Sequence, residues 1–461
     1  MPDTMLAEAP VLPRPPMPIG RRSQIEAIRT LRRNPLEMYG PPAFELPVLE
    51  GRLLGRQRLL LNSPPAIRHV LLDAHEDYVR SPITRRLLRP ILGQGLLLAE
   101  GAAWRHQRRT IAPAFAPRVM PMLARHIAAG AEEAVVALAS RAARGEDVID
   151  LHTALRHLTL TIAGRSMFSL EMDAFGERLR ALMHRYAERH VSPRMLDMLL
   201  PPAIPSPADI GRRAFQREWQ AFMDGVIAAR EGTPGEGRDL YDVLHAARDP
   251  ETGEGFSREG LRDEISTLIL AGHETTAVAL FWSCYLAVLF PESQERIAVE
   301  AARADLSPEA AGAAFEALHE TRAHLDEAMR LYPPAYLVVR MARKADTLPG
   351  PRTRVEEGAL ISMAPWVLHR HRTLWTDPER FDPSRFRPGA PPPDRFAYMP
   401  FGAGPRICVG ARFALAEGVI VLARLLREFR LEFAGDPMVV PLGRVTTQPD
   451  RRVGFRLVRR G

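Results

Sequence analysis

The sequence predicts a mainly helical protein with a smaller β region. An apolar helical stretch covers residues 257–290 and ends at Pro291, amphipathic helical patterning runs from 118 to 232, and a further amphipathic helix covers 411–427. A helix that is apolar on all sides belongs in the interior of a large protein, so residues 257–290 are expected at the centre of the core. Short strand-like runs, which predict the β region, occur at 44–50, 58–62, 335–340 and within 429–458.

Composition argues against several classes of protein. The formal charge is +7, but the excess is spread along the chain and no basic tract alternates with stacking aromatic residues, so nucleic-acid binding is not expected. The two cysteines, Cys284 and Cys408, provide no disulfide framework, which agrees with a reducing cytoplasm. Residues 1–20 are rich in proline without an apolar signal region, so neither a signal peptide nor a transmembrane anchor is expected.

We expect a proline-rich lead at residues 1–33 and a single domain at 34–461, because no long polar linker divides the later part. Residues 44–50 and 58–62 are expected as strands of a small sheet. Pro64 and Pro65 open a helix that continues through Leu72, since proline is tolerated in a first helical turn.

Residues 96–117 carry a tryptophan and an arginine that are four positions apart. Trp104 and Arg108 therefore share one face of a helix. Together they could bind a carboxylate, or they could simply form a cation–π or packing pair. Arg105, His106 and Arg109 point elsewhere and could form a basic docking face.

The long apolar helix is interrupted by polar residues, which argues against a membrane span. Ser257 is the expected N-cap. The interruption reads Ala271-Gly272-His273-Glu274-Thr275-Thr276. A buried carboxylate costs several kcal/mol unless it is paired or faces a wet cavity. Each threonine hydroxyl can donate a hydrogen bond to the backbone carbonyl one helical turn earlier. Gly272 has no side chain and so leaves room for a flat group to approach the helix. A helix kink with Glu274 paired to an arginine is the simpler alternative.

A glycine-rich loop with one cysteine, Phe401-Gly-Ala-Gly-Pro-Arg-Ile-Cys-Val-Gly410, precedes the helix at 411–427. A zinc site would need about four ligands, and Cys408 has no cysteine or histidine nearby. A dinucleotide fingerprint would need glycine at Ile407. A buried structural thiol explains neither the glycines nor Arg406. A single axial thiolate to haem iron fits all ten positions, and the helix N-terminus favours a thiolate.

The pattern Phe-x-x-Gly-x-Arg-x-Cys-x-Gly resembles the haem-binding loop of the cytochrome P-450 family. The resemblance covers roughly residue 34 onward and implies the family fold, with haem b between the long central helix and the helix that follows Cys408. It implies Cys408 as the axial iron ligand. It further implies a set of haem-contacting residues, namely Trp104, Arg108, Arg340, Phe401, Arg406 and Gly410.

The same resemblance implies roles for three more groups of residues. Glu274 and Thr275 match the family's acid–alcohol pair for proton delivery. Glu327 and Arg330, three apart on one helix, would form a structural triad with Arg385, whereas Arg380 occupies a variable position. The substrate pocket would include Ala271, Gly272, Ala335, Tyr336, Leu337 and Val338. The apolar loop at 195–205 would cover the substrate channel.

The implied reaction is insertion of one oxygen atom from dioxygen into a lipophilic substrate of fatty-acid, terpenoid or carotenoid type. Too few cysteines and no spare length remain for a redox domain. Electrons are therefore expected from a ferredoxin and ferredoxin reductase that dock on the Cys408 side. Two alternatives stay open: an enzyme that uses peroxide or rearranges hydroperoxides, and a non-catalytic haem-binding sensor.

Overall fold

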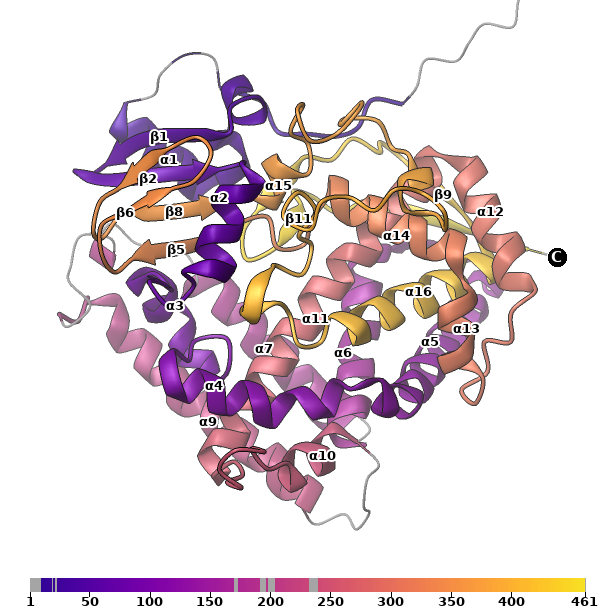
Figure 1. The fold of residues 1–461 in the computed structure, drawn as a ribbon. Helices are drawn as coiled ribbons and strands as arrows, with labels where there is room; N and C mark the ends of the chain where they lie inside the picture. The colour runs from indigo at the N-terminus through magenta and orange to yellow at the C-terminus, as the bar shows by residue number, and fades with distance from the viewer. Residues whose placement is uncertain are drawn as a thin grey trace, which may run out of the picture.

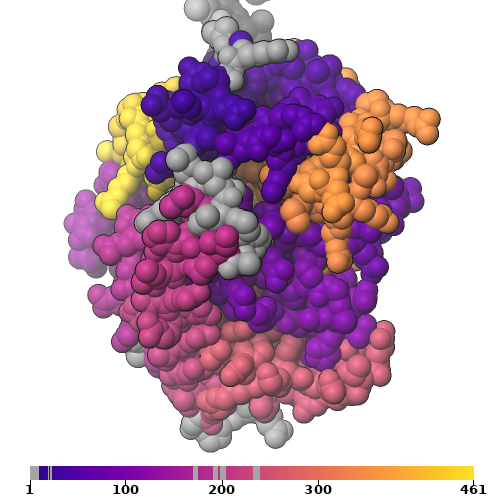
Figure 2. Space-filling view, turned by 90° about the vertical axis from the view of Figure 1, so that its left-hand side faces the viewer, coloured from indigo at the N-terminus to yellow at the C-terminus, as the bar shows by residue number. Residues whose placement is uncertain are grey.

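The protein is mainly helical with several small sheets, as the sequence predicts, and the largest of these lies at the upper left of Figure 1. The computed structural model describes residues 10–18, 20, 23–169, 173–190, 196–197, 204–231 and 239–460. Figure 2 shows the N-terminal segment in indigo above the helices near residues 180–220 in magenta at the left, with the segment near residue 350 in orange at the right.

The helices span most of the described chain. Their bounds are α1 Gln24–Arg33, α2 Pro64–Arg68, α3 Pro82–Leu92, α4 Gly101–Ile111, α5 Met120–Ala143, α6 Leu151–Phe168, α7 Asp173–Arg189, α9 Ala208–Glu231, α10 Leu240–Ala246, α11 Arg258–Leu289, α12 Pro291–Ala302, α13 Ala311–Ala317, α14 His319–Leu331, α15 Pro365–Leu368 and α16 Ala411–Glu428.

The largest sheet has the strand order β1-β2-β8-β5-β3. Its strands are β1 Val48–Leu53, β2 Arg56–Leu61, β8 Leu360–Met363, β5 Val338–Ala342 and β3 Tyr78–Val79. The β1–β2 hairpin turns through Leu54 and Gly55, which both have positive φ. β2 and β8 run parallel, and the other pairs are antiparallel.

Three smaller sheets complete the β region. β4 (Val148–Asp150), β12 (Gly454–Arg459) and β9 (Phe429–Ala434) form one sheet. The other two are hairpins: β10 (Pro441–Gly443) with β11 (Thr447–Pro449), and β6 (Asp346–Leu348) with β7 (Thr353–Val355).

Two strand boundaries differ from the prediction. Residues 41–44 form a 3-10 turn that starts at Pro41, so the first strand begins only at Val48. The predicted strand at 335–340 begins at Val338, because the chain has just left α14 through Pro333 and Pro334, which cannot donate to a ladder.

The segment up to residue 33 is more than an extended lead. α1 begins after Ser23, whose side chain forms a capping box with Glu26, a signal that the sequence analysis missed. Upstream of it, the carbonyl of Pro13 accepts a hydrogen bond from Tyr332 at 3.0 Å, so this part of the chain lies against the core.

α11 is the central helix of the core (Figure 1). Ser257 caps its N-terminus through a bond from the Gly260 N–H, as predicted. The helix is long and apolar enough to cross a membrane, but 72% of its most apolar window is buried inside the protein. Trp282 stacks on Tyr332, the residue that follows α14, with ring centroids 4.0 Å apart. We therefore identify α11 as a core helix.

Candidate functional site

The glycine-rich loop is a tight turn that ends in α16. Its residues Gly404–Arg406 form a 3-10 turn, and the Cys408 N–H donates to the Phe401 carbonyl at 2.9 Å. Gly404 has φ +73°, and a Cβ at this position would overlap the carbonyl oxygen of Leu71. Glycine at 404 thus lets the loop pack directly against the backbone of a neighbouring segment.

The two cysteines lie in different surroundings. Cys284 is fully buried in α11, and burial raises the pKa of its thiol to about 12. Cys408 is exposed, but the protein around it still raises the pKa of its thiol, against the opposing effects of the Gly410 N–H and the charge of Arg108. The helix terminus was expected to favour a thiolate, but the desolvating effect of the surrounding protein is larger than that of the Gly410 N–H. A metal ion would shift the balance, because a coordinating thiol is deprotonated outright.

α4 presents Trp104 and Arg108 to this loop, but the two do not form a pair with each other. Arg108 donates to the Ile407 carbonyl at 2.9 Å. The guanidinium of Arg406 lies over the Trp104 ring, 4.5 Å from its centroid. α4 therefore holds the loop that carries Cys408 from two points.

A cluster of buried and partly buried arginines flanks the loop. Arg340 and Arg406, both predicted, are joined by Arg80, which the sequence analysis missed. Burial and the charges of the other two arginines lower the pKa of Arg80 to about 9, and burial and Arg406 lower that of Arg340 to about 10. Glu100 opposes these shifts and forms an ion pair with Arg406.

Sheet pairing explains why Arg80 joins this cluster. Val79 of β3 pairs with Met341 of β5, so the next position along the register sets Arg80 beside Arg340. The buried Arg80 Nε finds no hydrogen-bond partner within the described residues. The positive charges of these arginines repel one another, so a group with two negative charges would stabilise the cluster. The two propionates of haem are such a group.

The middle of α11 faces open space. Ala271 is exposed although most of the helix is buried, and a Cβ at Gly272 would meet no atom within 4 Å. Thr275 donates its hydroxyl to the Ala271 carbonyl at 2.5 Å, as expected from the sequence. Open space beside a glycine, the exposed Cys408 and the arginine cluster together fit a flat, dianionic, iron-bearing group such as haem.

Glu274 points into the protein. Its side chain is only 7% exposed and accepts a hydrogen bond from the amide of Gln448 in β11. Burial raises its pKa, and the charge of Arg156 on α6 and the Gln448 bond oppose that shift. Gln448 is a second residue that sequence reasoning missed, because 174 positions separate it from Glu274 and no local signal links them.

The Glu327–Arg330 pair is fully buried, and Arg330 binds both carboxylate oxygens of Glu327 at 2.7 and 2.8 Å. Arg385 approaches Glu327 at 3.7 Å, whereas Arg380 contributes only its carbonyl to Arg330. The structure thus brings together the three residues that the sequence selected.

The predicted pocket residues have differing surroundings. Ala335 is exposed, and Leu337 and Val338 are half-buried. Tyr336 is buried, and its hydroxyl donates to the Arg444 carbonyl in the β10–β11 turn at 2.8 Å. Tyr336 therefore anchors that turn. Of the apolar loop at 195–205, residues 195 and 198–203 lie outside the described residues.

The expected basic docking face is largely occupied by ion pairs. Arg109 and His106 both bind Asp249, a fully buried carboxylate, with bonds of 2.8 Å. Arg105 pairs with Glu76 at the surface. Arg109 and His106 thus tie α4 to the segment after α10, and of the three only Arg105 keeps a largely exposed charge.

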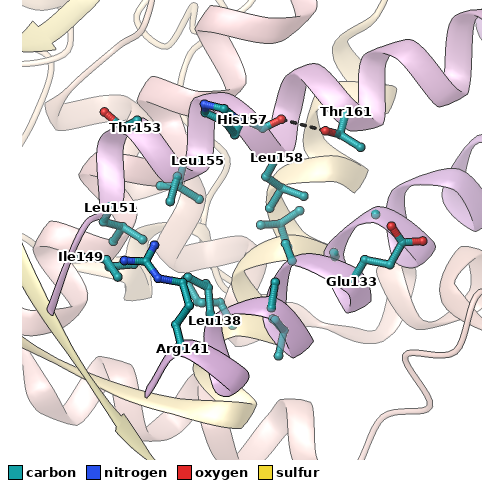
Figure 3. Close-up of a pocket in the computed structure, with 18 of the residues that line it drawn as sticks. Glu133, Leu138, Arg141, Ile149, Leu151, Thr153, Leu155, His157, Leu158 and Thr161 are labelled. Carbon is teal, nitrogen blue, oxygen red and sulfur yellow. Dashed lines mark hydrogen bonds between the residues drawn. The ribbon is translucent and has the colours of Figure 1, made fainter. Parts of the chain in front are cut away.

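A hollow of about 920 Å³ lies away from these residues, between α5, α6 and the far part of α16. Figure 3 shows Leu138, Leu155 and Leu158 pointing into it, with Arg141 and Glu133 at its rim. It contains none of the predicted site residues. In the described part of the chain no group of three or more His, Cys, Asp or Glu side chains could hold a metal ion.

Comparison with known proteins gives consistent results. The family model described as Cytochrome P450 matches residues 44–452. The chain is 30% identical to cyclooctat-9-en-7-ol 5-monooxygenase of Streptomyces melanosporofaciens, over 87% of this chain and 86% of the relative. It is 28% identical to the chloroplastic protein LUTEIN DEFICIENT 5 of Arabidopsis thaliana, over 91% and 73% respectively. The crystal structure of the cytochrome P450DA heme domain superimposes with a TM-score of 0.77 at 24% identity, covering 90% of each chain, which supports the fold.

Proposed function

Because the chain belongs to the cytochrome P450 family and is a monooxygenase of that family, we propose that it inserts one oxygen atom from dioxygen into a small lipophilic molecule. The observation that carries this proposal is the acid–alcohol pair Glu274–Thr275, set in the helix that packs against α16. A single exposed cysteine precedes α16.

Haem b is the proposed cofactor, and the Cys408 thiolate would bind its iron. When bound, it supplies the activation of dioxygen, and a thiolate ligand favours O–O cleavage. Arg80, Arg340 and Arg406 would bind its carboxylates. Trp104 and Arg108 would act on the Cys408 loop, between Phe401 and Gly410, through the contacts described above.

Proton delivery is the proposed role of Glu274 and Thr275. Cleavage of dioxygen with release of water consumes two protons, and a dry pocket needs a hydroxyl and an acid to pass them. The Thr275 hydroxyl rests on the Ala271 carbonyl, so it can turn to another acceptor by losing a single bond. Burial raises the pKa of Glu274, which suits a residue that donates a proton.

The proposed substrates are fatty acids, terpenoids or carotenoids. Supporting this class, Leu337 and Val338 offer half-buried apolar side chains directly after Tyr336, which binds the β10–β11 turn. One relative is named for oxidising cyclooctat-9-en-7-ol, and another is named for lutein deficiency.

The test is a spectral titration of the purified protein with a lipophilic library, followed by turnover under isotope-labelled dioxygen. We expect a reduced carbon monoxide spectrum typical of a thiolate ligand, a substrate-induced Soret shift and one labelled oxygen atom in the product. Cys408→Ser should lose the thiolate spectrum, and Thr275→Ala should divert electrons to peroxide. Turnover with peroxide alone, or an absence of any spin shift and reductant use, would refute the proposal.

A cytoplasmic ferredoxin with its reductase is the proposed electron source. Arg105 and Arg412 carry exposed charges on α4 and at the start of α16, beside the Cys408 loop, although each pairs with a surface glutamate. Reversal of either charge should slow reduction and weaken its dependence on salt. Arg109→Glu is unsuitable as a test of docking, because it would leave the buried carboxylate of Asp249 without its main partner and so perturb the fold. Unchanged reduction rates in both reversal variants would refute docking at this face.

A further inference from the structure

Two polar groups from distant parts of the chain act on the carboxyl of Glu274. Gln448 of β11 donates its amide N–H to Oε1 from one side. Arg156 of α6 supplies a positive charge that opposes the raised pKa of Glu274, without forming a direct ion pair. A buried acid that must both give and regain a proton needs neighbours that tolerate both of its states.

Gln448 is held firmly in place. Trp282, two turns along α11 from Glu274, donates its indole N–H to the Thr447 carbonyl at 2.7 Å. The Thr447 hydroxyl donates to Pro333 at 2.6 Å, and its N–H donates to Pro334 at 3.1 Å. β11 is thus fixed to α11 and to the segment after α14, so the Gln448 side chain approaches Glu274 from a rigid strand.

The amide of Gln448 is chemically suited to both states of the acid. Its NH₂ group donates to a carboxylate, and after a rotation of the amide its oxygen can accept from a protonated carboxyl. A lysine or arginine in direct contact would hold Glu274 ionised, and an apolar residue would leave the carboxylate without a partner. Glutamine avoids both outcomes.

The α6 side of Glu274 contains buried polar atoms without partners. Within the described residues, Arg156 Nε, His273 Nδ1 and His152 Nε2 make no hydrogen bond. The His273 ring lies against α6, where its Nε2 is 3.0 Å from the Arg156 carbonyl oxygen. Burial and the charge of Arg156 lower the pKa of His152 to about 4 and that of His273 to about 3, so both rings are neutral at pH 7.

Such orphaned atoms are costly unless water satisfies them, at about 1–3 kcal/mol each. A buried water needs two to four polar partners, and these three unpaired atoms are groups to which such water could bind. Arg156 is half-buried and its neighbour His157 is exposed, so the cluster extends from the surface of α6 to α11.

We propose that Gln448 and Arg156 are positioning residues for Glu274, and that water held among Arg156, His152 and His273 reloads this acid with protons from the α6 side. The inference rests on the proposed role of Glu274 in proton delivery. In each cycle Glu274 gives its proton towards Thr275 and takes one from this water, which regains a proton from the solvent. One proton thus moves from the solvent towards Thr275, and Glu274 has the same protonation state at the end of the cycle as at its start.

The test uses the infrared band of the protonated Glu274 carboxyl in the resting protein, identified by its loss in Glu274→Gln. Gln448→Leu should shift the band position, because a hydrogen-bond partner is lost. It should also raise the proton affinity of Glu274 by about tenfold or more, as expected for the loss of a bond to a charged group. Arg156→Met should raise the proton affinity as well, because a nearby positive charge is removed.

Two variants serve as matched controls. Arg165→Met lies on the same helix, where Arg165 binds Glu133 away from α11, and should leave the band unchanged. Gln448→Asn keeps the amide on a shorter stem, and should fall between the parent and Gln448→Leu. In turnover, Arg156→Met and Gln448→Leu should release more peroxide per electron and show a larger solvent isotope effect than the parent.

Two results would overturn the inference. One is a band position that is the same in Gln448→Leu as in the parent. The other is a titration of the Glu274 band that is the same in Arg156→Met as in Arg165→Met, including a band that never titrates. Because the band is measured without substrate or electrons, these results are separate from a failure of oxygen insertion in the parent protein, which would instead refute the proposed function.

Discussion

Glu264 provides a sharp test of how burial sets the stability of this protein. It lies in α11, its side chain is 0% exposed, and Oε2 accepts the Leu96 N–H at 3.0 Å. Oε1 has no hydrogen-bond partner in the described chain. Burial raises the pKa of this carboxyl from 4.5 to about 8, with the Leu96 bond opposing and Asp263 adding to the shift.

The folded protein therefore binds this proton more tightly than the unfolded chain does. The resulting stability is fully present below the unfolded pKa of 4.5 and is lost as the pH rises towards about 8. Linkage between these two values predicts that Glu264 lowers the free energy of unfolding by about 2 kcal/mol between about pH 6 and about pH 8.

Glu264→Gln removes the titration and keeps an oxygen that can accept the Leu96 N–H. We expect the variant to gain about 2 kcal/mol of stability relative to the parent on going from about pH 6 to about pH 8. The measurement is urea unfolding followed by tryptophan fluorescence, after reversibility has been checked. Glu259→Gln, exposed on the same helix, is the control. Parallel pH profiles for the parent and Glu264→Gln would refute the reasoning.

Three further predictions concern the Cys408 loop, the buried ion pair and the arginine cluster. Gly402→Ala should cost about 1–2 kcal/mol of stability, because Gly402 has a positive φ. Gly404→Ala should cost clearly more, because Gly404 also has a positive φ and a Cβ there would overlap the backbone of Leu71. Equal urea midpoints for the two variants would contradict this prediction. Glu327→Gln should cost about 3–5 kcal/mol by urea unfolding, against less than about 1 kcal/mol for the surface variant Glu432→Gln. Arg80→Met should speed haem transfer to a scavenger protein by about tenfold, and an unchanged rate would exclude Arg80 from the haem site.

Local patterns predicted the parts of the structure that depend on local interactions. Ser257 and Pro291 bound α11 because capping and helix termination act over a few residues. The Thr275 hydroxyl bond to Ala271 follows from helical geometry alone. The predicted start of the first strand was wrong because proline at position 41 favours a 3-10 turn, a local signal that was available but was not weighed.

Charge pairing was less predictable from local patterns. Arg109 was assigned to a docking face, yet Asp249, 140 positions later, binds it inside the protein. A basic side chain on a helix surface has the same local signature whether it faces solvent or a buried carboxylate from elsewhere. The pKa of the Cys408 thiol likewise depends on the protein packed around it, whose desolvating effect outweighs the Gly410 N–H and the charge of Arg108.

The segments that carry chemistry could be recognised in the sequence: the Cys408 loop, the acid–alcohol pair in an apolar helix and the Glu327–Arg330 spacing. These depend on residue types at fixed separations, which a single chain displays directly. Only the tertiary structure decided their partners. Arg80 reaches Arg340 through the pairing of β3 with β5, and Gln448 reaches Glu274 because β11 is fixed to α11. Contacts between distant segments leave no mark in local spacing, because they arise from packing of the complete fold.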